Sequence, residues 1–73
     1  MTTLLVCEDE RIIRKRILNA VDWTAQGVDR VLEAENADEA MALVEGEKID
    51  ILLTDIRLPG QSGLDLVERL REK

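Results

Sequence analysis

The sequence predicts an α/β fold in which a parallel β-sheet carries helices on both of its faces. Short apolar runs alternate with amphipathic segments, and the strand-then-helix order occurs three times within 73 residues. This alternation favours parallel strands joined by right-handed crossovers that pack against the sheet. The length allows one small domain, near the size at which a single hydrophobic core becomes marginal.

The first strand is predicted at Leu4–Cys7, an apolar run that ends abruptly at Glu8. Apolar character without interruption is typical of a strand that is buried on both faces. From Arg11 the apolar spacing becomes helical and predicts an amphipathic helix that ends near Trp23. We expect its inner stripe and its outer side to contain, respectively, Ile13, Ile17, Ala20 and Val21, and Arg14, Lys15 and Asn19.

The second unit follows a connector at residues 24–29, which contains Gly27. The segment Arg30–Glu35 is a more polar strand and therefore resembles a sheet edge. Asn36 can cap the next helix, and Glu39 stands three residues on, as in a capping box. The helix is expected to end near Gly46, and its inner face to contain Ala40, Met41, Leu43 and Val44.

The third unit begins with a nearly continuous apolar strand between Ile49 and Thr54. Strand alternation predicts that Ile49, Ile51 and Leu53 share one face, opposite Asp50, Leu52 and Thr54. A loop at residues 58–63 follows, and Ser62 can cap a last helix. Its predicted inner residues are Leu64, Val67 and Leu70, and Asp65 can pair with Arg69 on its exposed side.

Composition excludes several classes of function. The net charge of −6 and the pI near 4.5 argue against direct nucleic-acid binding by this segment, which would need clustered positive charge. The apolar runs are too short to cross a bilayer, and no secretory signal precedes them, so we expect no membrane association. Cys7 is the only cysteine and cannot form an internal disulfide. The expected location is the cytoplasm.

The candidate chemistry lies where the apolar strands end. Glu8 and Asp9 follow the first strand, and Asp55 follows the third. Parallel strands share one carboxyl edge, where open α/β sheets bind ligands, so these carboxylates converge if the two strands are neighbours. Such a cluster needs a cation, hard oxygen ligands suit Mg²⁺, and Mg²⁺ can assist phosphoryl transfer to a carboxylate. Taken alone, the acidic run after the first strand would read as solvated loop charge.

Two segments resemble the signature segments of bacterial two-component response regulator receiver domains. They are Leu5–Glu10 and Leu53–Gly63, and the second combines a buried strand, Asp55, Pro59 and Gly63. The resemblance covers the whole chain and implies a flavodoxin-like fold with strand order 2-1-3. It also implies that Asp55 is the phosphoacceptor, and that Mg²⁺ is bound by Glu8, Asp9, Asp55 and the backbone carbonyl of Arg57. Many receivers carry Asp where this chain has Glu8.

The resemblance further implies a phosphoacceptor rather than an enzyme, with a sensor histidine kinase as partner and donor. The chain contains no His and cannot itself be a phosphohistidine donor. In the family the first helix docks the kinase, and this one begins with Arg11, Arg14, Lys15 and Arg16; an ordinary solvated face explains these four equally well. Asp22, Trp23 and Gly27 resemble receivers linked to AraC-type DNA-binding domains.

Receivers have five strands, so residues 1–73 are interpreted as a partial receiver domain, its first three strand–helix units. The family's Thr or Ser after strand four and Lys after strand five have no counterpart here. The apolar third strand would then lie at a sheet edge, which invites pairing with a second copy and predicts a homo-oligomer. The alternative function is a half-domain that acts as a self-association module. A Mg²⁺-dependent phosphatase ranks last, because Arg57 occupies the place of its usual second Asp.

Overall fold

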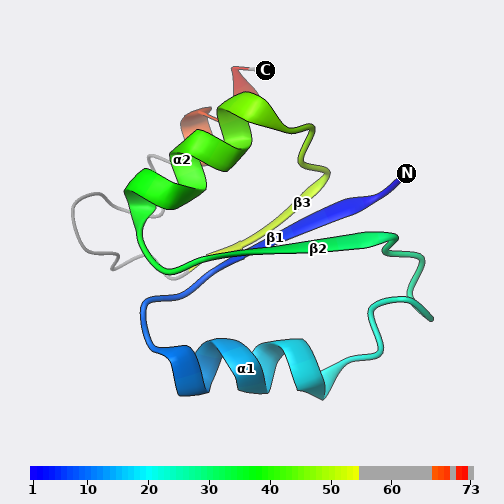
Figure 1. Ribbon diagram of the computed structural model, residues 1–73. Helices are drawn as coiled ribbons and strands as arrows, with labels where there is room; N and C mark the ends of the chain where they lie inside the picture. The colour runs from blue at the N-terminus through cyan, green and yellow to red at the C-terminus, as the bar shows by residue number, and fades with distance from the viewer. Residues whose placement is uncertain (55–66, 70, 73) are drawn as a thin grey trace.

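The computed structural model describes residues 1–54, 67–69, 71 and 72. Its elements run in the order β1, α1, β2, α2, β3, with the bounds Thr3–Cys7, Arg11–Ala20, Arg30–Ala34, Ala37–Gly46 and Ile51–Thr54. The three strands are parallel and lie in the order β2-β1-β3, as the sequence predicts. Helix α1 covers one face of the sheet and α2 the other (Figure 1).

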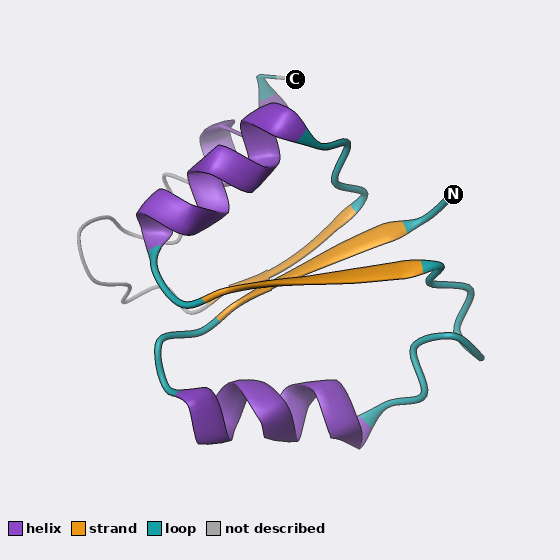
Figure 2. Ribbon diagram, in the orientation of Figure 1, coloured by secondary structure: helices purple, strands orange, loops and turns teal. Residues whose placement is uncertain are grey.

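Strand β1 is the centre of the sheet and the centre of the core. All five of its residues are buried. It pairs in register with β2 from Thr3↔Arg30 to Cys7↔Ala34, and with β3 from Leu4↔Ile51 to Cys7↔Thr54. The carboxyl ends of the three strands therefore meet at one edge of the sheet, seen on the left in Figure 2.

The core on the α2 side follows the sequence pattern closely. Ala37, Ala40 and Val44 are buried, with Met41 and Leu43 packed against the same cluster. The amide N–H of Glu39 donates to Asn36 Oδ1 at 2.8 Å, which confirms the predicted cap. Glu39 Oε1 accepts from the N–H of Glu35 at 3.0 Å, one residue before the position expected in a capping box. The helix ends at Gly46, as predicted.

The core on the α1 side differs from the prediction. It consists of Leu4, Val6 and Val28, with Ile17, Leu18 and Trp23 packed against it. The predicted inner stripe of α1 is confirmed at Ile17 and wrong at its other three positions, because Ile13, Ala20 and Val21 are exposed. The partly buried positions are instead Arg14, Ile17 and Leu18, which share a face at i, i+3 and i+4. On this face, Arg14 donates hydrogen bonds to Glu33 and to the carbonyl of Glu8.

Helix α1 also ends at Ala20, before Trp23. The side chain of Asp22 accepts from the N–H of Ala25 at 3.2 Å and begins a turn. The carbonyl of Trp23 accepts from the N–H of Val28 at 2.9 Å, and Gly27 adopts a φ of 91°, in the region that favours glycine. The connector therefore begins with its own hydrogen-bonded turn, and this turn replaces a continuation of α1.

Strand β3 begins later than expected. Ile49 precedes it and lies buried in the cluster on the α2 side. Ile51 and Leu53 pair with Leu4 and Val6, whose side chains form the α1-side core. The prediction that Ile49 shares a face with Ile51 and Leu53 is therefore wrong, because strand alternation does not extend upstream of Ile51.

After β3, the described residues Val67–Arg69 and Arg71 are helical, and Glu72 lies in a turn. Val67 was expected on the inner face but is exposed. Arg69, two residues on and so on the opposite side of the helix, pairs with Glu45 of α2 at 2.7 Å. Ser62, Leu64, Asp65 and Leu70 lie outside the described residues. Within the described part of the chain, no helix is both long enough and apolar enough to span a membrane.

Candidate functional site

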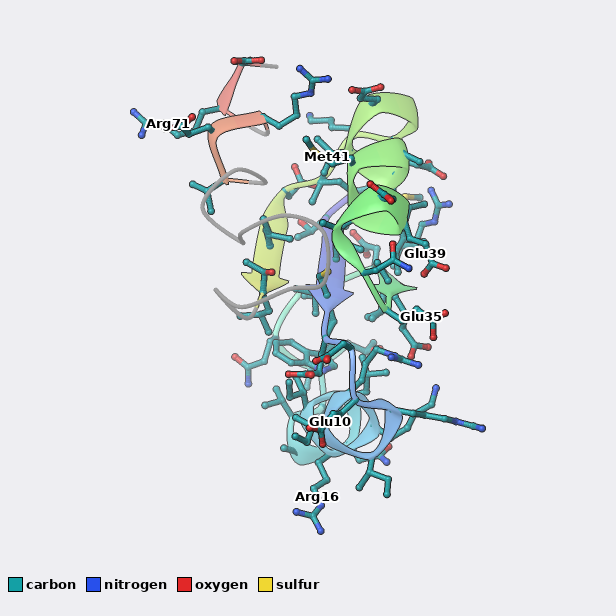
Figure 3. The ribbon with its side chains drawn as sticks, turned by 90° about the vertical axis from the view of Figure 1, so that its left-hand side faces the viewer. Glu10, Arg16, Glu35, Glu39, Met41 and Arg71 are labelled. Atoms are coloured by element: carbon teal, nitrogen blue, oxygen red, sulfur yellow. The ribbon has the colours of Figure 1, made fainter. Side chains whose placement is uncertain are left out.

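The candidate site lies at the carboxyl edge of the sheet, where β1 leads into α1. Figure 3 views the molecule from this side, with Glu10 at the start of α1 and with Glu35 and Glu39 beside the start of α2. Acidic residues therefore follow both β1 and β2 at this edge. Alternation of strands and helices brings them together, since each strand enters its helix on the same side.

Glu8 is held at three points. Its N–H donates to the carbonyl of Ala34 at 3.0 Å and so extends the β1–β2 ladder by one bond. Its carbonyl accepts from Arg14 Nη1 at 2.8 Å, and its Oε2 accepts from the N–H of Glu10 at 2.9 Å. Glu8 is only 7% exposed. A carboxylate is therefore fixed at the end of the central strand.

Asp9 is exposed and follows this anchored residue directly. On the neighbouring strand, Thr54 is the register partner of Cys7, and Asp55 is the next residue in the sequence. The predicted site residues Asp55 and Arg57 lie outside the described residues. Among the residues that are described, no three His, Cys, Asp or Glu side chains are grouped to hold a metal ion. The three-carboxylate site thus stays a prediction, although Glu8 and Asp9 offer the hard oxygen donors that Mg²⁺ prefers.

A cluster of ion pairs flanks the acidic loop on the α1 side. Arg14 Nε lies 3.0 Å and Lys15 Nζ 3.1 Å from Glu33 Oε1 on β2. The hydrogen bond from Lys15, together with that from Arg14 and the two positive charges, lowers the pKa of the Glu33 carboxyl below its ordinary value, although burial opposes the change. Arg14 and Lys15 were expected on the outer side of the helix, and Arg14 instead faces the sheet, with its side chain only 11% exposed. The available signal was Glu33 itself, a charged residue on β2 that is in register with Val6 and so lies on the face of the sheet that α1 covers.

Cys7 is a buried thiol that directly precedes Glu8. Burial raises the pKa of its thiol, and a hydrogen bond with Thr54 opposes that shift. Its Sγ donates weakly to the carbonyl of Asn36 at 3.6 Å. The thiol therefore belongs to the core and is unsuited to act as a thiolate.

The fold and this edge define a class of protein: a parallel α/β domain with an acidic loop after its central strand and helices on both faces. Residues 4–73 match the family model of the response regulator receiver domain. The chain belongs to the response regulator receiver domain family of two-component systems, as the resemblance implied.

Known relatives agree with this assignment. The chain is 32% identical over 72 residues to an uncharacterised response regulatory protein of Staphylococcus epidermidis, covering 99% of this chain and 29% of that protein. It is 31% identical over 67 residues to the transcriptional regulatory protein HptR of Staphylococcus aureus, covering 92% of this chain and 27% of HptR. The chain thus spans less than a third of the length of these curated relatives.

Two solved structures share the fold. The REC domain of AraT, a response regulator from Geobacillus stearothermophilus, superposes with a TM-score of 0.90 at 36% identity, covering 99% of this chain and 56% of that one. The response regulator MaeR, bound to beryllium trifluoride, gives a TM-score of 0.82 at 28% identity, covering 99% of this chain and 58% of that one. Both matches support the flavodoxin-like arrangement of the three strands.

Proposed function

We propose that this chain is a phosphoacceptor receiver domain that takes a phosphoryl group on Asp55 in a Mg²⁺-dependent reaction. One observation carries the proposal. Cys7 and Thr54 are register partners on neighbouring strands, so Glu8 and Asp55 directly follow paired residues at the same edge. Membership in the receiver family supports the same assignment.

In the proposed step, a carboxylate oxygen of Asp55 attacks the phosphorus of a phosphohistidine on the donor. The P–O bond forms as the P–N bond breaks, and the leaving imidazole nitrogen keeps the electron pair and takes up a proton. Glu8, Asp9, Asp55 and the carbonyl of Arg57 would hold Mg²⁺, which neutralises charge on the phosphoryl oxygens when bound. Asp55 is modified once per transfer, so the domain is proposed to be a substrate of its kinase and not an enzyme.

The proposed partner is a sensor histidine kinase that docks on the outer side of α1. Arg14 and Lys15 are occupied by Glu33, whereas Arg11 and Arg16 pair with no acid among the described residues. Ile12 lies beside them and is 70% exposed. Figure 3 shows Arg16 extending away from the sheet. An exposed apolar side chain beside two arginines would complement a kinase surface that has acidic groups around an apolar centre.

We further propose that the protein is located in the cytoplasm. We propose that this segment does not contact nucleic acid, since its net charge is −6. An AraC-type DNA-binding domain elsewhere in a longer protein is compatible with the name of HptR, a transcriptional regulatory protein.

A second candidate function, self-association, is favoured by the surface of β3. Ile51 and Leu53 are 39% and 37% exposed, and among the described strands β3 has a neighbour on one side only. A second copy pairing along this strand would give a homo-oligomer and cover both side chains.

Incubation with acetyl phosphate and Mg²⁺, followed by peptide mass spectrometry, tests the phosphoacceptor assignment. We expect a phosphoryl adduct on Asp55, lost in Asp55→Asn and retained in the control Asp38→Asn, whose carboxylate lies on the exposed side of α2. Beryllium trifluoride, which has the size and charge of a phosphoryl group, serves as a second probe. An adduct mapped to Glu8 or Asp9 would contradict the assignment, and binding of beryllium trifluoride without any adduct would point to a defective transfer step.

A further inference from the structure

We propose that Arg14 is a positioning residue whose guanidinium sets the direction of the peptide that joins Glu8 to Asp9. The orientation of this peptide follows from the contacts of Arg14, and its consequence for Mg²⁺ binding rests on the proposed function. Among the described residues, the hydrogen bonds of the Arg14 side chain go to Glu33 and to the backbone carbonyl of Glu8, and not to the carboxylate of Glu8 or Asp9. It acts on them through the backbone.

The guanidinium joins three elements. Arg14 lies on α1, its Nη1 donates to the carbonyl of Glu8 in the loop at 2.8 Å, and its Nε donates to Glu33 on β2 at 3.0 Å. Its side chain is only 11% exposed. A guanidinium is planar with donors at fixed angles, so Glu33 orients the donor that reaches Glu8.

These bonds restrict the one backbone rotation that aims Asp9. The N–H of Glu8 is fixed to Ala34 of β2, so the residue cannot turn as a unit. Its carbonyl, on the other side of the Cα atom, is fixed to Arg14. Together the two bonds define the plane of the peptide between Glu8 and Asp9, because a peptide unit is planar. The orientation of this peptide plane sets the direction in which the backbone of the exposed Asp9 continues.

Electrostatics alone would predict the opposite effect of Arg14 on a cation. A positive side chain beside an acidic loop repels Mg²⁺, so removal of its charge should tighten binding. If Arg14 positions the loop, removal should weaken binding instead. The sign of the change therefore separates the two explanations.

The test compares Arg14→Met with Arg30→Met in the 73-residue chain. Arg30 is a matched control, because it also forms an ion pair with a glutamate, Glu47. It lies at the amino end of β2, whereas the candidate site lies at the carboxyl ends of the strands. Calorimetry with MgCl₂ measures affinity, and amide hydrogen exchange at Glu10 in metal-free protein reports the loop. We expect Arg14→Met to weaken Mg²⁺ binding by roughly tenfold or more, as for other groups that orient ligands, and to speed exchange at Glu10, with Arg30→Met leaving both unchanged.

Two further variants keep the test decisive if Arg14→Met does not fold. Arg14→Lys keeps the charge without the planar fork and should recover only part of the affinity, and Glu33→Gln should weaken binding in the same direction. Equal or tighter Mg²⁺ binding in these variants, or unchanged exchange at Glu10, would overturn the proposal. If wild-type protein binds no Mg²⁺, the metal part of the proposed function fails, and exchange at Glu10 still decides the role of Arg14.

Discussion

Thr3 and Asp50 are joined by two reciprocal hydrogen bonds. The N–H of Thr3 donates to Asp50 Oδ2 at 2.8 Å, and the N–H of Asp50 donates to the carbonyl of Thr3 at 2.9 Å. Asp50 precedes β3 directly, so this pair sets the register of β3 on β1 before the first ladder position. Thr2 and Asp29 repeat the arrangement ahead of β2, at 2.7 Å and 2.9 Å. The start of β1 is thus hydrogen-bonded on both sides, to the residue that precedes β2 and to the residue that precedes β3.

Asp50→Ala is expected to destabilise the fold by about 1 to 3 kcal/mol, because it leaves the buried N–H of Thr3 without its acceptor. Asp29→Ala is the matched control, since the equivalent bond to Thr2 is exposed and water can replace the carboxylate. Urea unfolding followed by circular dichroism measures both. A loss in Asp29→Ala as large as that in Asp50→Ala would contradict this explanation.

The predicted metal site makes Mg²⁺ binding depend on Asp9 and Asp55. Removing either carboxylate removes a hard oxygen ligand and a negative charge, so Asp9→Ala and Asp55→Asn should each lower the affinity by more than about tenfold. Asp38→Asn serves as a control on exposed charge. Calorimetry is the measurement, and equal affinity in wild type and the double variant would end the assignment of these ligands.

Glu33 predicts a specific dependence of stability on pH. Its pKa is lower in the folded protein than the ordinary 4.5, so its ionised form stabilises the fold. That contribution is fully present above pH 4.5 and is lost as the pH falls through the folded pKa. The difference in unfolding free energy between wild type and Glu33→Gln should therefore be present at pH 7 and shrink as the pH falls below 4.5 and through the folded pKa. Urea titrations at a series of pH values measure it, with Glu68→Gln as a control that breaks no ion pair among the described residues. A difference that does not change across the acidic range would contradict the role of the ion pairs.

Association through β3 predicts that a charge on its exposed face breaks the assembly. Leu53→Lys places a cation at a position that is already 37% exposed, so the monomer should still fold. Val31→Lys is a close control, because Val31 has the same exposed fraction but lies on β2, the strand on the other side of β1. Sedimentation at micromolar concentration should show a smaller species for Leu53→Lys only. A folded wild-type monomer under these conditions would remove the basis for the self-association proposal.

The sequence predicted well those features that depend on neighbours along the chain. Periodicity identified β1, α2 and the order of the elements, and Asn36 marked the start of α2 through a bond that spans three residues. The acidic residues after β1 were also evident, because they interrupt an apolar run. These signals are local, so a single sequence contains them in full.

The sequence by itself determined the alternating α/β order, the buried central strand and the acidic edge, because apolar period and charge at strand ends are properties of consecutive residues. The tertiary structure decided which face α1 buries and where β3 begins. Arg14 turns inward because it reaches Glu33, which lies 19 residues away, and β3 starts at Ile51 because Asp50 binds Thr3, which lies 47 residues away. Such contacts form only once the strands are side by side, so the apolar pattern of α1 alone could not predict that Arg14 faces the sheet while Ile13 and Val21 are exposed.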